Sequence, residues 1–85
     1  MINNNADLYD TVHSLRDKLR EAGEEDWSLA LDEALSISSV PGEILGELRL
    51  QLQRVRGGPV GNQLGLNGQI DEALSYLNQI LSPEK

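Results

Sequence analysis

The sequence predicts an all-α protein, a small bundle or array of four amphipathic helices. The apolar residues are mainly aliphatic, with 15 Leu, 5 Ile and 4 Val against 1 Trp, 2 Tyr and no Phe. Leu favours helices, whereas the residues that favour strands are scarce. Apolar residues also recur at steps of three and four along four segments, which is the spacing of one helix face. Because the chain has only 85 residues, we expect a single domain, residues 1–85, with a modest core.

The first predicted helix covers about residues 6–22. Asn5 or Asp7 are its candidate N-caps, since a short side chain with an oxygen accepts a bond from the first free N–H groups. Gly23 ends it, and residues 1–5 before it are expected to fray. Its predicted inner face consists of Leu8, Val12, Leu15 and Leu19.

The second predicted helix covers about residues 25–37. It begins with three adjacent carboxylates, Glu24, Glu25 and Asp26, which the positive end of the helix dipole stabilises. Its predicted inner face consists of Trp27, Ala30, Leu31, Ala34 and Leu35.

The third predicted helix covers about residues 41–56 and opens with Pro41, which fits the first turn of a helix. Gly46 in its interior costs up to about 1 kcal/mol relative to Ala, so we expect a packing reason such as a close helix crossing. Leu50 lies opposite the inner face and is expected to be on the outside. The predicted inner face consists of Ile44, Leu45, Leu48, Leu52 and Val55.

The fourth predicted helix covers about residues 69–82, with Asn67 or Gly68 as its cap. Two acids, Asp71 and Glu72, are expected in its first turn. Its predicted inner face consists of Ile70, Ala73, Leu74, Leu77 and Leu81.

A glycine-rich loop, residues 57–68, is expected to join the third and fourth helices. It lacks the Lys and the following Ser or Thr of a nucleotide-binding P-loop, and no predicted strand precedes it. Arg54 and Arg56 could hold an anion together with N–H groups of the fourth helix, so ligand binding by this loop is kept as an alternative. Leu64 and Leu66 are expected to pin the loop onto the core.

The net charge of −7 is uneven along the chain. Residues 1–33 carry nine acids and three bases, or −6, and residues 34–85 carry five acids and four bases, or −1. This balance repels phosphate backbones and anionic lipid, so we expect no nucleic-acid or membrane partner and favour a basic protein partner. The start of the chain does not resemble a signal peptide and no apolar run is long enough to span a bilayer, which predicts a cytoplasmic protein.

Little in the sequence points to catalysis. The chain has no Cys and one histidine, His13, which excludes thiolate chemistry and a typical zinc site. The histidine is expected to be an exposed surface residue, since no nucleophile motif accompanies it. We therefore predict no enzyme and no catalytic, cofactor-binding or metal-binding residues.

The candidate partner-binding residues are Glu24, Glu25, Asp26 and Trp27. Trp27 has two interpretations: a core residue, which we favour, or an exposed aromatic anchor of an interface. In the second case the three acids beside it would suit a basic partner with a groove.

Two stretches, "LREAGEEDWSLAL" over residues 19–31 and "GGPVGNQL" over residues 57–64, resemble a family of small uncharacterised bacterial helical proteins. The family pattern has an AGExxW turn and a later segment with three glycines, although this chain has an extra residue there and lacks the family's Asn-Asp pair. The resemblance implies a leucine-rich helical fold and no assigned activity. The stretch at residues 68–81 also looks like one helix of a tetratricopeptide unit, but such repeats need about three copies to be stable.

Three hypotheses about function follow. The leading one is a small acidic protein-binding module, by analogy an immunity protein, an antitoxin or a regulator. The second is a homo-oligomer, such as a homodimer, that buries surplus leucines, and the third is a small-ligand-binding protein that uses the glycine-rich loop. The leucines available to a homo-oligomer are Leu29, Leu50, Leu64 and Leu66.

Overall fold

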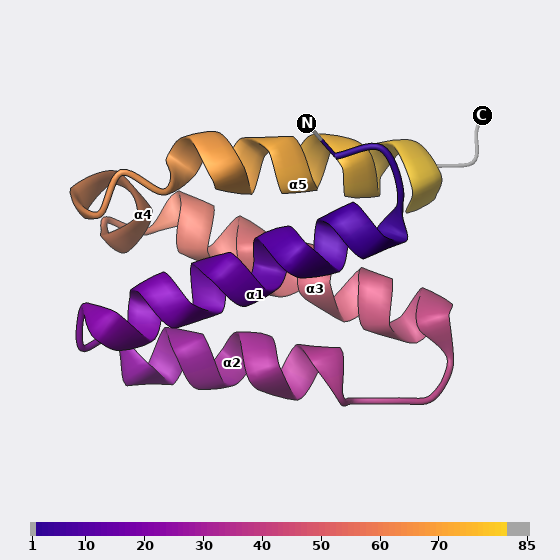
Figure 1. Cartoon of the computed structure of the whole chain (residues 1–85), viewed down its shortest axis with the longest axis horizontal. Coiled ribbons are helices and arrows are strands. Elements are labelled where there is room, and N and C mark those ends of the chain that lie inside the picture. Colours follow the sequence, from indigo (N-terminus) through magenta and orange to yellow (C-terminus); the bar gives the residue numbers. More distant parts are fainter. Residues whose placement is uncertain (1, 82–85) are drawn as a thin grey trace.

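The computed structural model describes residues 2–81, which form five α-helices and, within that range, no strand (Figure 1). The all-α prediction is confirmed. The helices are α1 (Asn5–Glu21), α2 (Glu25–Leu35), α3 (Pro41–Gly57), α4 (Val60–Gln63) and α5 (Asn67–Leu81).

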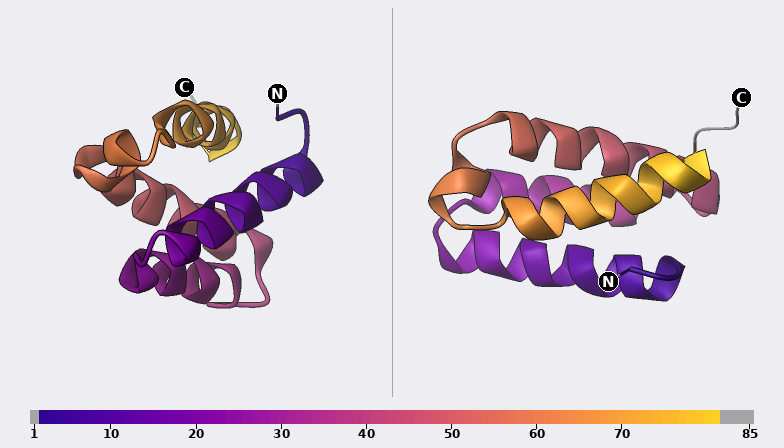
Figure 2. Two further views of the ribbon diagram at one scale, coloured as in Figure 1. Left: turned by 60° about the vertical axis from the view of Figure 1, so that its left-hand side comes forward. Right: turned by 90° about the horizontal axis from the view of Figure 1, so that it is seen from above.

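The four long helices form a ring around one core. Helix α1 packs against α2 and α5, and helix α3 packs against the same two. The pairs α1/α3 and α2/α5 lie diagonally, with no Cα atoms within 8 Å of each other in the described range. Successive long helices run in opposite directions (Figures 1 and 2). The structure is therefore an up-and-down bundle, which answers a question that the sequence left open between a bundle and an orthogonal array.

The core follows the predicted inner faces closely on α1, α3 and α5. On α2 only Leu31 and Ala34 are fully buried, while Trp27 and Leu35 pack against the core from its edge. Ser28 is the one buried polar residue of this helix, so the inner face of α2 is turned slightly from the predicted one. The buried hydrophobic residues are Leu8, Val12, Leu15, Leu19, Leu31, Ala34, Leu45, Leu48, Leu52, Val55, Val60, Leu66, Ile70, Ala73 and Leu77.

Gly23 ends α1, as predicted, through a specific turn. Its φ of 84° lies in the left-handed region, which glycine adopts without strain. Gly23 N–H donates to the Arg20 carbonyl at 3.0 Å, and Glu24 N–H donates to the Leu19 carbonyl at 2.8 Å. These two bonds form a Schellman motif and leave the chain directed into α2.

Helix α2 ends at Leu35, two residues before the predicted end. Ser36 N–H bonds the Glu33 carbonyl, and Ser36 Oγ donates to the Asp32 carbonyl at 3.1 Å. Ser side chains compete with the helical pattern in this way, so the last turn closes early. Ile37 consequently lies outside the helix with 56% of its surface exposed.

The segment 57–68 is not the continuous loop that the sequence predicted. It contains α4 and a second Schellman motif, in which Gly65 N–H (φ 70°) donates to the Asn62 carbonyl and Leu66 N–H donates to the Gly61 carbonyl. Leu66 is buried in the core, as predicted. Leu64 is 38% exposed, so the prediction that it also packs onto the core is wrong.

Helix α5 begins at Asn67 itself, so neither Asn67 nor Gly68 is its cap. Leu66 enters the core directly after the turn at Gly65, and this starts the helix earlier than predicted. Asp71 and Glu72 therefore lie beyond the first turn, which contains no acid.

Gly46 does not mark a close helix crossing. A Cβ added there meets no heavy atom within 4 Å, so the packing reason that we expected is wrong. The crowded glycine is Gly61, where an added Cβ would collide with the side-chain oxygen of Asn67 and lie 3.3 Å from the end of Ile70. That Asn67 oxygen is buried and has no hydrogen-bond partner.

The residues before α1 make specific contacts. Ile2 packs against the core, and Asn4 caps α1 by accepting from Asp7 N–H at 2.8 Å. The cap is thus neither of the two residues that the sequence suggested, and the helix includes Asn5. Fraying of residues 1–5 stays a prediction; residue 1 and residue 82, the predicted end of the last helix, lie outside the described range.

Candidate functional site

The three acids of the predicted acidic turn differ in exposure. Glu24 is half-buried: its N–H bonds to Leu19, its carbonyl accepts from Ser28 N–H at 3.0 Å, and its side chain does not cap α2. Glu25 and Asp26 are exposed in the first turn of α2. Glu25 and Asp26 are therefore the more accessible two of the three acids.

Trp27 lies beside these acids but on the inner side of α2. It is partly buried and packs against the core. The structure therefore does not bring its ring together with Glu25 and Asp26 on one exposed face.

Leu29, rather than Trp27, is the large apolar residue exposed beside the acids of α2. It is 56% exposed, one turn after Glu25 and Asp26 and one turn before Asp32 and Glu33. Residues three and four apart on a helix are surface neighbours. Helix α2 thus carries an exposed leucine among four carboxylates and no base, a juxtaposition that the spacing in the sequence contains and that our site prediction missed.

A hollow of about 330 Å³ lies beside Leu29, between α1 and α2. Asp32 in its wall is paired with Arg16 at 2.8 Å, and Arg16 also pairs with Asp17 at 3.1 Å. The hydrogen bonds to Asp32 and then to Asp17 raise the pKa of Arg16 above its ordinary value. The hollow is lined by Arg20, Glu25, Asp26, Ser28, Leu29 and Asp32.

A groove of about 430 Å³ lies on the other side of α2, between α2 and α3. Its acids are Glu33 and Glu47, and no base within residues 2–81 lines it. Gln51 donates to Glu47 Oε2 at 2.7 Å and fixes this half-buried carboxylate. We call this the α2/α3 groove; it is lined by Ala30, Glu33, Ala34, Ser36, Ile37, Glu47 and Gln51.

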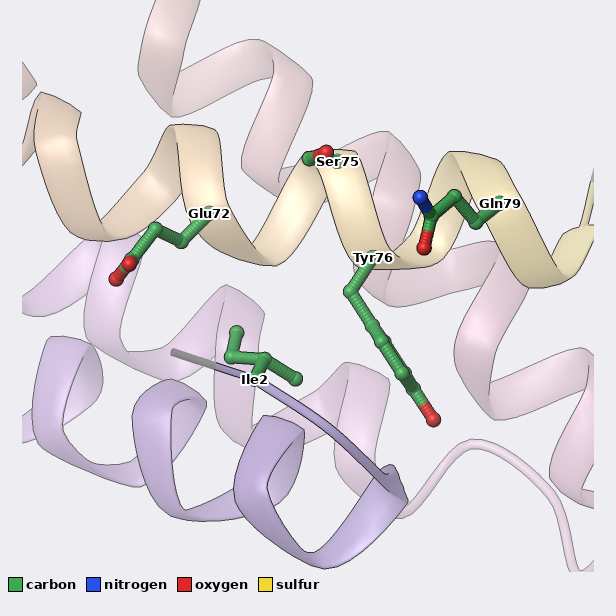
Figure 3. Close-up of a pocket in the computed structure, with 5 residues that line it drawn as sticks. All are labelled: Ile2, Glu72, Ser75, Tyr76 and Gln79. Carbon is green, nitrogen blue, oxygen red and sulfur yellow. The ribbon is translucent and has the colours of Figure 1, made fainter.

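A third hollow, of about 240 Å³, separates the N-terminal segment from α5 (Figure 3). Ile2 lies on one side of it, and Tyr76 extends from α5 and donates to Asn5 Oδ1 at 2.5 Å. Among the residues that the structure describes, Glu72 is its only charged lining residue. This arrangement ties the first residues to the bundle.

The basic residues before the glycine-rich segment have different surroundings. Arg56 pairs with Asp71 of α5 at 2.7 Å, which holds α3 and α5 together and reduces its capacity to bind an anion. Arg54 is exposed near the end of α3.

Other predicted features also have definite positions. His13 is exposed on α1, and within residues 2–81 no three His, Asp or Glu side chains are grouped so as to hold a metal ion. Leu29 and Leu50 are exposed, whereas the burial of Leu66 removes it from any surplus apolar surface. Over the same range, no helix has both the length and the apolar character needed to cross a bilayer.

Comparison with models of known protein families, with curated proteins and with solved structures found no match for this chain.

Proposed function

We propose that this chain is a small acidic protein-binding module that acts through the outer face of α2. The observation that carries the proposal is the exposed Leu29 with three acids, Glu25, Asp26 and Glu33, within one turn of it on α2 and without an ion-pair partner among the described residues. An apolar side chain within a charged rim is the usual composition of an interface anchor. A regulator or an inhibitor of the immunity or antitoxin kind fits this description.

Charge supports a basic partner. Glu25, Asp26 and Glu33 have no ion-pair partner among the described residues, so their charges are available to a cationic surface. Uncompensated charges of one sign speed the encounter with an opposite surface and make binding weaken with salt. The family resemblance and the cytoplasmic location remain expectations beside this proposal.

Capture of the partner from a lysate of the source organism tests the proposal. The wild-type chain and a Glu25→Lys/Asp26→Lys variant serve as baits. The control is Asp10→Lys/Glu72→Lys, which changes the net charge equally at two exposed carboxylates away from α2. We expect the wild type and the control to retain the same protein, and the α2 variant to lose most of it.

Retention of that protein by the α2 variant at wild-type level would exclude this surface as the binding site. A further variant, Leu29→Ser, separates the apolar contribution from the charges. We expect it to weaken capture at high salt as well as at low salt, because apolar contacts are not screened.

A further inference from the structure

We propose that the α2/α3 groove binds a basic amphipathic helix of the partner protein. This inference rests on the proposed function and specifies the partner's chemistry and where it docks. It adds to the outer face of α2 a second contact on the α3 side of this helix, beyond the acidic turn that the sequence indicated.

The apolar lining of the groove runs along one edge of α2 and continues past its end. Ala30 and Ala34 lie one turn apart on α2; Ala34 is buried and forms the floor, and Ala30 is half-buried. Ile37, in the segment after α2, is 56% exposed and contributes the largest free apolar surface of the three. Together they form an apolar stripe between two helices, the kind of groove that takes the apolar face of an amphipathic helix.

The charges of the groove select the partner's polar residues. Glu33 lies on the α2 side and Glu47 on the α3 side, and neither has a cationic partner among the described residues. Glu47 is half-buried and is held by the Gln51 amide, which is a neutral donor. Carboxylates on both sides of an apolar stripe favour Lys or Arg on both flanks of the partner's apolar face.

The same charges disfavour a second copy of this chain as the occupant. Two copies related by a two-fold axis present the same patch to each other. This would bring Glu33 and Glu47 of each copy near those of the other, and α2 supplies no base to compensate. The net charge of −7 adds a general repulsion between two copies.

A labelled synthetic peptide of 18 residues, with Leu on one helical face and Lys on the other, is the probe. Binding is measured by fluorescence anisotropy, and its location by backbone amide chemical shifts of the full chain. We expect the largest shifts along the groove, at Ala30, Ala34, Ile37 and Gln51. A peptide of the same composition with its faces permuted, and one with Glu in place of Lys, are expected to bind at least about tenfold more weakly.

Paired variants decide whether the groove itself binds. Ile37→Ser and Glu33→Gln/Glu47→Gln are expected to weaken binding about fivefold or more. Their controls are Ile80→Ser, at another exposed isoleucine, and Asp10→Asn/Glu72→Gln, at two exposed carboxylates that have no ion pair among the described residues and do not line the groove. We expect changes of less than about twofold for the controls, because surface charges away from a binding site contribute little.

Several outcomes would overturn the inference. Equal weakening by the charge control Asp10→Asn/Glu72→Gln would mean that net charge alone attracts the peptide. Equal binding of the permuted peptide would remove the requirement for a helical face. Shifts confined to Glu25, Asp26 and Leu29 would reject the groove but leave the proposed function intact. Concentration-dependent shifts at the groove without peptide would identify a second copy as its occupant. The proposed function itself fails only in the lysate experiment, which does not use the peptide.

Discussion

At the scale of single residues, two glycines in helices show how differently the same residue can be used. Gly46 stands in the interior of α3 with open space where a side chain would go, whereas Gly61 in α4 is buried against Asn67 and Ile70. Glycine is the less stable choice in a helix because the unfolded chain has more freedom to lose. Of these two glycines, only Gly61 compensates for this loss of stability, because it lets Asn67 and Ile70 pack close to the backbone of α4.

Substitution by alanine should therefore have opposite effects at the two positions. We expect Gly46→Ala to raise the free energy of unfolding by up to about 1 kcal/mol. Gly61→Ala is expected to lower it by about 1–3 kcal/mol, because the added methyl group overpacks a buried site. Urea denaturation followed by the fluorescence of Trp27, the single tryptophan, measures both changes.

The contact at Gly61 supplies the control for this pair. In the double variant Gly61→Ala/Asn67→Ala the colliding side chain is shortened, so part of the lost stability should return. Equal free energies for the two single variants would show that the space around these glycines does not determine their effect.

The sequence could not distinguish these glycines, because the atoms that crowd Gly61 come from a different helix. The same limit applies to Trp27, whose two interpretations depended on how far α2 is turned toward the core. Leu50 was predictable, since its place opposite the inner face follows from helical spacing alone, and it is 44% exposed.

At the scale of helices, the starts are stabilised unequally. Asn4 caps α1 with its side chain, but Val40 precedes α3 without any side-chain bond to the helix. Val40 has the extended backbone of an N-cap (φ −94°, ψ 115°), and Pro41 follows it as the first helical residue. The local geometry of a cap is thus present, and the missing part is a side-chain oxygen.

Val40→Ser should supply that oxygen and stabilise the protein by about 1 kcal/mol. Val40 is half exposed, so little buried surface is lost in the exchange. Its own N–H already donates to Ser38 Oγ at 3.0 Å, which holds the turn in place. Thermal unfolding by circular dichroism measures the gain, and Val40→Ala, which has no oxygen, is the matched control. A melting temperature no higher for the serine variant than for the alanine variant would contradict the capping explanation.

The positions of the helices could be predicted better than their ends. The long apolar repeats of α1 and α3 gave their ranges to within one residue. The early end of α2 depends on the Ser36 side chain, and the formation of α4 depends on the turn at Gly65 and the burial of Leu66. Such ends are decided by individual hydrogen bonds and by contacts from distant segments, which periodicity does not contain.

At the scale of the whole molecule, the ring of helices explains what could be predicted of the candidate site. The acids of α2 are consecutive or nearly so in sequence, and their exposure follows from the helix alone. The α2/α3 groove requires Glu47 and Gln51 of α3 to lie beside Ala34 and Ile37, and this juxtaposition depends on which helices are neighbours. The α2/α3 groove could not be predicted, therefore, because the sequence left the topology of the helices open.

The ring also makes α3 central to stability, because α3 contacts α2, α4 and α5. Leu48 on its inner face is fully buried, whereas Leu50 on the same helix is 44% exposed. We expect Leu48→Ala to lower the free energy of unfolding by about 2–5 kcal/mol through lost burial and the cavity that remains. Leu50→Ala should change it by less than about 0.5 kcal/mol.

The stability lost in Leu48→Ala should affect the other helices as well as α3. A domain of this size has one core and unfolds in a single transition, so Trp27 fluorescence, which reports on α2, and circular dichroism, which reports on all helices, should give the same midpoint. Two separate midpoints for Leu48→Ala would mean that α1 and α2 remain folded without α3. In that case the α2/α3 groove would be lost while the acidic face of α2 survived, and the two surfaces could be tested for binding in one protein.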